Sequence, residues 1–109
     1  ATASLSFGSV PLLPGAADLA GTGITTGGGE RNLAAVEPLV EWAPGLPETA
    51  PDLLADPQTS GGLLISLPAD DAPRLIDELK SAAVDTRVIV GKILNPGELK
   101  AGKRIHVTP

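Results

Sequence analysis

The chain has 109 residues, a formal net charge of −5 and no cysteine. This length suits one domain, which buries roughly two-thirds of the surface that its unfolded form exposes. The acidic balance argues against a nucleic-acid partner, because such binding depends on lysine and arginine neutralising phosphates. The absence of cysteine excludes disulfides and thiolate metal sites.

No apolar run approaches the roughly 20 residues that a membrane-spanning helix needs. The first residues, Ala1–Ser4, lack the charged and apolar regions of a signal peptide. We therefore expect a cytoplasmic protein with no membrane partner. Aromatic residues are only 2% of the chain, so Phe7 and Trp42 share a core of smaller side chains. Smaller side chains bury less area each, and we expect stability to depend on neighbours.

The first third of the chain predicts short elements. Apolar spacing over Leu12–Ala20 predicts a short helix, because glycines follow it as terminators. Residues 21–29 are rich in glycine and threonine and predict a loop. Asn32 is expected to cap a turn that runs to Glu37.

The middle of the chain alternates extended and helical signals. Leu39–Trp42 is expected to be extended, and the capping pattern at Thr49 predicts a helix to Ala55. A polar segment, Asp56–Gly62, then leads into Leu63–Leu67, which predicts a buried strand ending at Pro68.

The last third contains the clearest helix, which Asp70 or Asp71 caps. Its apolar residues are spaced three or four apart along one face: Ala72, Leu75, Ile76, Leu79, Ala82 and Ala83. Arg87–Ile93 and Arg104–Thr108 follow as strands. This succession predicts an α/β (α+β) fold, a mixed sheet with helices packed on one side.

The common catalytic and metal-binding patterns are absent. Ser60 is not in a Gly-x-Ser-x-Gly elbow, because position 58 is Gln. His106 is the only imidazole, and we expect it on an edge strand facing solvent. One histidine and scattered carboxylates do not converge by spacing, so we predict no catalytic residue and no metal ligand within the chain.

Two polar segments have ambiguous chemistry. In Asp56–Gly62, Asp56 precedes a proline and leaves the helical region, the hydroxyls of Thr59 and Ser60 follow, and two glycines permit close approach. This pattern fits a tight structural turn or a ligand-holding loop, and Asp56 can accept hydrogen bonds from the N–H groups of the turn. Thr26–Gly29 fits a flexible loop or an anion-binding nest.

The string Asp56–Leu64 resembles the signature loop of the C-terminal domain of selenophosphate synthetase (selenide, water dikinase), in the aminoimidazole ribonucleotide synthetase-like superfamily. Further segments are similar to the family in the same order: Val10–Ala16, Thr26–Leu33, Val40–Trp42, Leu53–Ala55 and Val88–Gly91. The resemblance runs from about Val10 to about Ile93. The tail, residues 94–109, lies outside it.

The resemblance implies a role in making selenophosphate from selenide, ATP and water, with AMP and phosphate as further products. The family uses magnesium and a Cys or selenocysteine nucleophile, both held mainly by an N-terminal ATP-binding domain. Residues 1–109 are therefore expected to form a single, incomplete domain, the C-terminal part of a two-domain enzyme. Its implied partners are that N-terminal domain and a second copy, and we expect no cofactor to bind this chain alone.

The resemblance also implies which residues line the phosphate cavity: Asp56, Thr59, Ser60, Gly61, Gly62, Gly27, Gly28, Arg31 and Asn32. The chain departs from the family pattern at two positions. Gly29 replaces a hydroxyl residue and Glu30 replaces an arginine. A carboxylate repels polyphosphate, which puts phosphate contact from this segment in doubt.

Three other interpretations stay open. The chain could belong to another ATP-dependent synthetase of the superfamily, such as a purine-pathway enzyme or a hydrogenase-maturation factor. It could be a non-catalytic binding or assembly module. It could also be a degenerate relative that kept the fold and lost the ligand, which Glu30 would suit.

Overall fold

A computed structural model describes residues 1–109. The elements follow in the order β1 (Thr2–Ser6), α1 (Ala16–Gly21), α2 (Gly27–Val36), β2 (Val40–Trp42), α3 (Ala50–Ala55), α4 (Ala72–Ser81), β3 (Gly91–Leu94) and β4 (Ile105–Thr108). The four strands form one mixed sheet, which confirms the predicted α/β class. The longest helices have 10 residues, and none has the length and apolar character needed for crossing a membrane.

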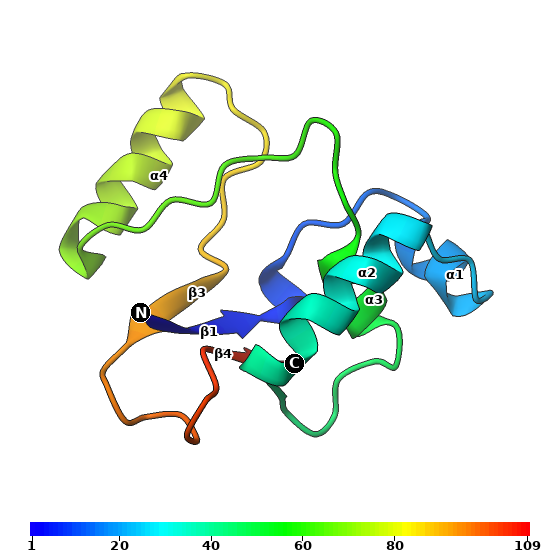
Figure 1. Cartoon of the computed structure of the whole chain (residues 1–109). Helices are drawn as coiled ribbons and strands as arrows, with labels where there is room; N and C mark the ends of the chain where they lie inside the picture. The colour runs from blue at the N-terminus through cyan, green and yellow to red at the C-terminus, as the bar shows by residue number, and fades with distance from the viewer.

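The sheet has the strand order β2-β4-β1-β3 (Figure 1). β4 pairs in parallel with both β1 and β2, whereas β3 pairs antiparallel with β1. Because side chains alternate between the faces of a sheet, the register groups them in rows. One face carries the apolar row Ile93, Ala3, Ile105 and Val40, and the other carries the polar row Lys92, Ser4, His106 and Glu41.

Both central strands come from the ends of the chain. β1 was not among the predicted elements, although its alternation of Thr2, Ser4 and Ser6 with Ala3 and Leu5 is a strand pattern. β4 falls within the predicted Arg104–Thr108 segment but lies inside the sheet. The tail that the family resemblance left out therefore supplies a central strand.

The buried core is small. Val40 and Val107 from the sheet and Ala50 and Ala55 from α3 are its buried apolar residues. The chain exposes 7685 Å², whereas a compact monomer of this mass exposes about 5,600 Å². Its radius of gyration is 14.9 Å, compared with about 13 Å for a compact domain of this length. Much surface therefore stays uncovered, including that of large apolar side chains such as Leu13 and Leu63.

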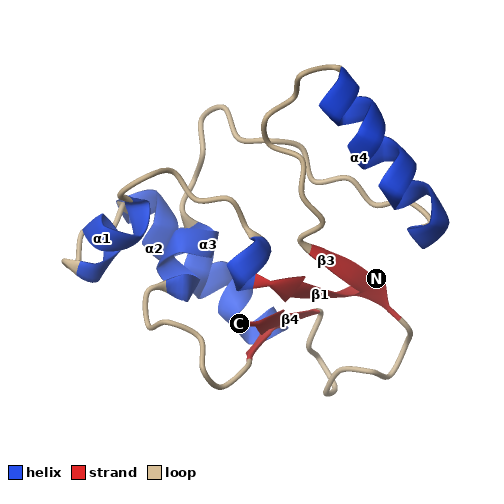
Figure 2. Cartoon of the chain, turned by 180° about the vertical axis from the view of Figure 1, so that it is seen from behind, coloured by secondary structure: helices blue, strands red, loops and turns tan.

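The expected buried strand at Leu63–Leu67 is wrong in this structure. The segment forms no strand, and Leu63 and Leu64 are 91% and 78% exposed. It belongs to the connection from α3 to α4, and α4 lies apart from the other helices (Figure 2). A strand requires a partner for its backbone groups, and residues 57–67 make no backbone–backbone hydrogen bond.

Two neighbouring predictions were also too long. The strand expected over Arg87–Ile93 is confined to β3, which begins at Gly91 and ends at Leu94. The helix expected to reach Ala83 ends at Ser81, because Ala83 has a φ of 56°. Asp71 occupies the N-cap position of α4, as expected, but its side chain makes no capping hydrogen bond.

Candidate functional site

The glycine run that sequence reasoning assigned to a loop begins a helix instead. Gly27–Gly29 form the first turn of α2, and Thr26 is its N-cap. The Thr26 hydroxyl accepts a hydrogen bond from the Gly29 N–H at 3.0 Å. The loop expectation was wrong because this cap satisfies an otherwise unpaired helix donor, and the glycines then continue into a helix-forming segment.

Asn32 was also assigned wrongly, because it does not cap a turn. It lies inside α2, and its side-chain amide donates to the Ala55 carbonyl at 2.9 Å. Ala55 is the last residue of α3, where a carbonyl has no partner within the helix. Asn32 therefore ties α2 to the end of α3, directly before the polar loop, as residues 57–62 are called from here on.

Asp56 ends α3, as expected, but its hydrogen bonds come from side chains and not from the backbone of the turn. Its Oδ1 accepts from the Thr26 hydroxyl at 3.0 Å, and its Oδ2 accepts from the Gln58 amide at 2.5 Å. The carboxylate thus joins the start of α2 to the polar loop. These two segments, 30 residues apart in sequence, are therefore in contact.

A close backbone approach accompanies these hydrogen bonds. A Cβ added at Gly28 would lie 2.7 Å from Cγ of Pro57, which is too short for a carbon–carbon contact. Gly29 is buried, and a Cβ there would lie 3.1 Å from the Thr26 hydroxyl. The glycines therefore serve helix–loop packing, the use that glycine has where two backbone segments meet.

The polar loop itself is exposed. Thr59, Ser60, Gly61 and Gly62 all face solvent, and no side chain approaches the position of a Cβ at Gly62 within 4 Å. Their hydroxyls and N–H groups are free of protein hydrogen bonds. Donors of this kind are available to a ligand or to a second polypeptide that covers the loop.

Two charged residues lie at the start of α2 beside the polar loop. A guanidinium nitrogen of Arg31 lies 3.6 Å from where a Cβ at Gly27 would be, so this cation lies over the first turn. Glu30 accepts a hydrogen bond from the Thr25 hydroxyl at 3.0 Å. The helix N-terminus thus has one cationic and one anionic neighbour. The cation attracts a bound anion, whereas the carboxylate repels it.

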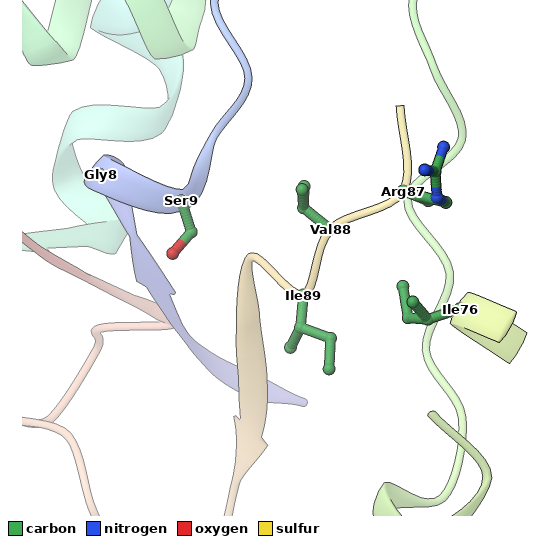
Figure 3. A pocket seen from close by; sticks show the side chains of 6 residues that line it. All are labelled: Gly8, Ser9, Ile76, Arg87, Val88 and Ile89. Atoms are coloured by element: carbon green, nitrogen blue, oxygen red, sulfur yellow. The ribbon is translucent and has the colours of Figure 1, made fainter. Parts of the chain in front are cut away.

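Two hollows in the surface are lined by residues other than the predicted site residues. One, of about 500 Å³, lies between the 3-10 turn that follows β1, the segment before β3, and α4, and Ser9, Ile76, Val88 and Ile89 are among its lining residues (Figure 3). The other, of about 350 Å³, lies at the turn between β3 and β4. The polar loop is therefore an exposed surface in this chain and not the wall of a closed cavity.

The polar row of the sheet is a second group of titratable residues that sequence reasoning did not assemble. The expectation of an edge position for His106 was wrong: it lies on β4 between Ser4 and Glu41 of the neighbouring strands. Glu41 accepts from Lys100 at 2.7 Å, and this bond holds the pKa of Glu41 below its ordinary value of 4.5. The alternation of polar residues in Thr2–Ser6 and Ile105–Thr108 was the available signal.

No group of three or more His, Cys, Asp or Glu side chains converges as metal ligands would. Asp70 and Asp71 lie in a short 3-10 turn before α4, far along the chain from Asp56. The site that the structure assembles is therefore a junction of α2, α3 and the polar loop, in which a hydroxyl and a side-chain amide donate to one carboxylate.

The chain is similar to several curated proteins, although no family model matches it. It is 41% identical over 103 residues to a selenide, water dikinase of Myxococcus xanthus (strain DK1622), covering 94% of this chain and 27% of that protein. It is 37% identical over 93 residues to a selenide, water dikinase of Aliarcobacter butzleri (strain RM4018), covering 85% and 27%. Selenide, water dikinase 2 of Peptoclostridium acidaminophilum is 37% identical over 97 residues, covering 89% and 28%. The chain spans about a quarter of the length of these relatives, at their C-terminal end.

Proposed function

Because this chain belongs to the selenide, water dikinase family and corresponds to the C-terminal part of its members, we propose that it closes the reaction cavity of such an enzyme. In this proposal the N-terminal ATP-binding part supplies the nucleophile and the magnesium ligands. The polar loop and the first turn of α2 supply hydrogen-bond donors to the bound phosphates. Positioning and charge stabilisation dominate phosphoryl transfer, so such donors contribute without reacting themselves.

The observation that carries the proposal is the junction at Asp56. The structure brings Thr26–Asn32 and Asp56–Gly62 into contact, and these are the segments in which the candidate cavity residues lie. The hydroxyls and N–H groups of Thr59–Gly62 face outward and are free to bind. Exposed donors on a loop that a helix holds in place suit a surface that covers a ligand bound elsewhere.

The uncovered apolar surface supports docking on a larger partner. The chain exposes about 2,000 Å² more than a compact monomer of its mass, and interfaces between domains of one chain cover about 600–1,500 Å². Leu63, Leu64 and Ile65 adjoin the polar loop and are among the exposed large side chains. A partner that covers them would also meet the polar loop, as the N-terminal part of the same enzyme would.

A chimeric enzyme tests the proposal. The C-terminal 27% of the Myxococcus xanthus relative is replaced by this chain, and selenophosphate formation from ATP and selenide is followed by phosphorus NMR. We expect the chimera to be active, the relative without its C-terminal part to be inactive, and this chain alone neither to bind nor to hydrolyse ATP. An inactive but folded chimera, or ATP hydrolysis by the chain alone, would contradict the proposal.

One observation favours a second candidate, a relative that docks but no longer assists the reaction. Glu30 lies in the first turn of α2, where it places a carboxylate beside the proposed phosphate position. A carboxylate in this place repels a bound phosphate, because both groups are negatively charged. In the chimera, Glu30→Arg distinguishes the two functions. Full activity of the chimera with Glu30 supports a part that assists the reaction. A chimera that is active only with Glu30→Arg supports the degenerate relative.

A further inference from the structure

The polar loop needs something other than its own backbone to hold it. Residues 57–62 belong to no helix or strand and make no backbone–backbone hydrogen bond. A loop without backbone hydrogen bonds samples many conformations unless side-chain contacts fix it. What fixes this loop is therefore found in the side-chain contacts that it makes with α2.

Thr26 makes the first of these contacts. Its hydroxyl accepts from the Gly29 N–H and donates to Oδ1 of Asp56, both at 3.0 Å. A hydroxyl has a single proton, so this pair of bonds fixes its direction. The start of α2 and the carboxylate of Asp56 are thereby held in one relative orientation.

Asp56 and Gln58 extend the contact into the loop. The second oxygen of Asp56 accepts from the Gln58 amide at 2.5 Å. The Cβ of Gln58 lies 3.2 Å from where a Cβ at Gly61 would be, so the aliphatic part of this side chain lies against Gly61. A continuous series of contacts therefore runs from Thr26 through Asp56 and Gln58 to Gly61.

Gly28 sets the distance between α2 and the loop. Its missing side chain leaves room for the Pro57 ring, which a Cβ would meet at 2.7 Å. The ring is part of the backbone of the loop and cannot rotate away. Any side chain at position 28 therefore moves the loop away from α2.

We propose that Thr26, Gly28 and Asp56 are positioning residues that hold Thr59–Gly62 in the orientation in which they meet the bound phosphates. This role rests on the function proposed above. The hydrogen bonds that Asp56 accepts are solvent-exposed, and exposed bonds of this kind contribute little to folding. The bond from the Gly29 N–H to the Thr26 hydroxyl is part-buried and caps α2, and the loss of such a cap destabilises a helix only modestly. Their loss therefore misplaces the loop while the chain stays folded.

The first test follows the loop in this chain alone, by nitrogen-15 relaxation of its amides. Thr26→Val keeps the shape of the side chain but removes the hydroxyl, and Thr26→Ser keeps the hydroxyl. We expect Thr26→Val to lower the heteronuclear NOE of Ser60, Gly61 and Gly62 while α4 is unchanged, and Thr26→Ser to restore the wild-type values. Thr22→Val is the matched control, since the Thr22 hydroxyl donates only to the Leu19 carbonyl in α1.

The second test uses the chimera with the Myxococcus xanthus relative. We expect Thr26→Val to raise the KM for ATP about tenfold, and Thr26→Ser and Thr22→Val to leave it within about twofold. A substitution that only lowers the folded fraction would lower kcat and leave KM unchanged. The change in KM therefore separates positioning from a general loss of structure.

The outcomes of the two tests are distinguishable. Unchanged loop relaxation in Thr26→Val, or failure of Thr26→Ser to restore it, overturns the positioning role whatever the chimera does. An active chimera whose KM is unaffected by Thr26→Val overturns it as well. A chimera that is inactive with the wild-type sequence overturns the proposed function, and the relaxation measurement then decides whether the contacts hold the loop.

Discussion

Two regions of this protein contain apolar segments that could form strands, but only one of them does. β1 and β4, at the ends of the chain, pair with each other and carry Val107, which is 2% exposed. Leu63–Leu67 is more apolar than either of these strands, and residues 85–89 are about as apolar as β1, yet neither segment makes a backbone–backbone hydrogen bond. An apolar sequence therefore predicts the capacity to form a strand, whereas a partner strand decides whether one forms.

The largest expected effect is at Gly91, where β3 meets β1. A Cβ there would lie 2.0 Å from the Ser4 carbonyl oxygen, so Gly91→Ala forces the two strands apart. We expect a loss of about 3 kcal/mol in the free energy of unfolding, measured by urea denaturation with Trp42 fluorescence. Gly62→Ala, where nothing lies within 4 Å, is the control from the unpaired region. Equal stability of the two variants would contradict the difference between the paired strands and the unpaired segment.

The next effect compares one buried and one exposed apolar residue. Val107→Ala removes two methyl groups from the core and is expected to cost about 2 kcal/mol of unfolding free energy. Leu63→Ala removes a larger group from a side chain that is 91% exposed, and we expect a change within about 0.5 kcal/mol. A large loss from Leu63→Ala in urea denaturation would indicate that this segment is covered in solution.

A smaller effect is expected at the contact between α2 and the polar loop. Gly28→Ala gains about 1 kcal/mol of helix propensity but meets Pro57, and we expect a net loss of about 1 kcal/mol. Gly27→Ala in the same turn has only an ordinary contact with Arg31, at 3.6 Å, and should be neutral or stabilising. Thermal unfolding of both variants measures the difference, and a more stable Gly28→Ala would argue against the close contact.

The smallest effect concerns the polar row of the sheet. Lys100 holds the pKa of Glu41 below 4.5 in the folded chain, so this ion pair stabilises the fold above that pH and the contribution is lost as pH falls through the lowered pKa. Lys100→Gln should raise the pKa of Glu41 and move acid unfolding to slightly higher pH. An NMR titration of the Glu41 carboxyl checks this, with Lys80→Gln in α4 as control. An unaltered Glu41 titration in Lys100→Gln would contradict the assignment.

The candidate site was partly predictable. Residue types alone singled out Asp56–Gly62 and Thr26–Gly29 but left each open between a structural loop and a ligand-binding loop. Only the resemblance to the family implied that they line a phosphate cavity. That Asp56 binds Thr26 could not be predicted, because the two residues are 30 positions apart and many carboxylates could fill the same role. The helical state of Gly27–Gly29 was missed, because glycine has a low helix propensity and the cap that overrides it is a neighbour's hydroxyl.

By itself the sequence determined the elements with strong local signals: the helix around α4 from its apolar spacing, α3 from its capping pattern and proline, and β2 and β4 from short extended runs. It also determined the family, through the string Asp56–Leu64. Only the tertiary structure decided that Thr2–Ser6 is a central strand, that His106 lies inside the sheet, and that Leu63–Leu67 is unpaired. The reason is physical: a helix satisfies its hydrogen bonds within a few residues, whereas a strand satisfies them with a partner that local sequence does not specify.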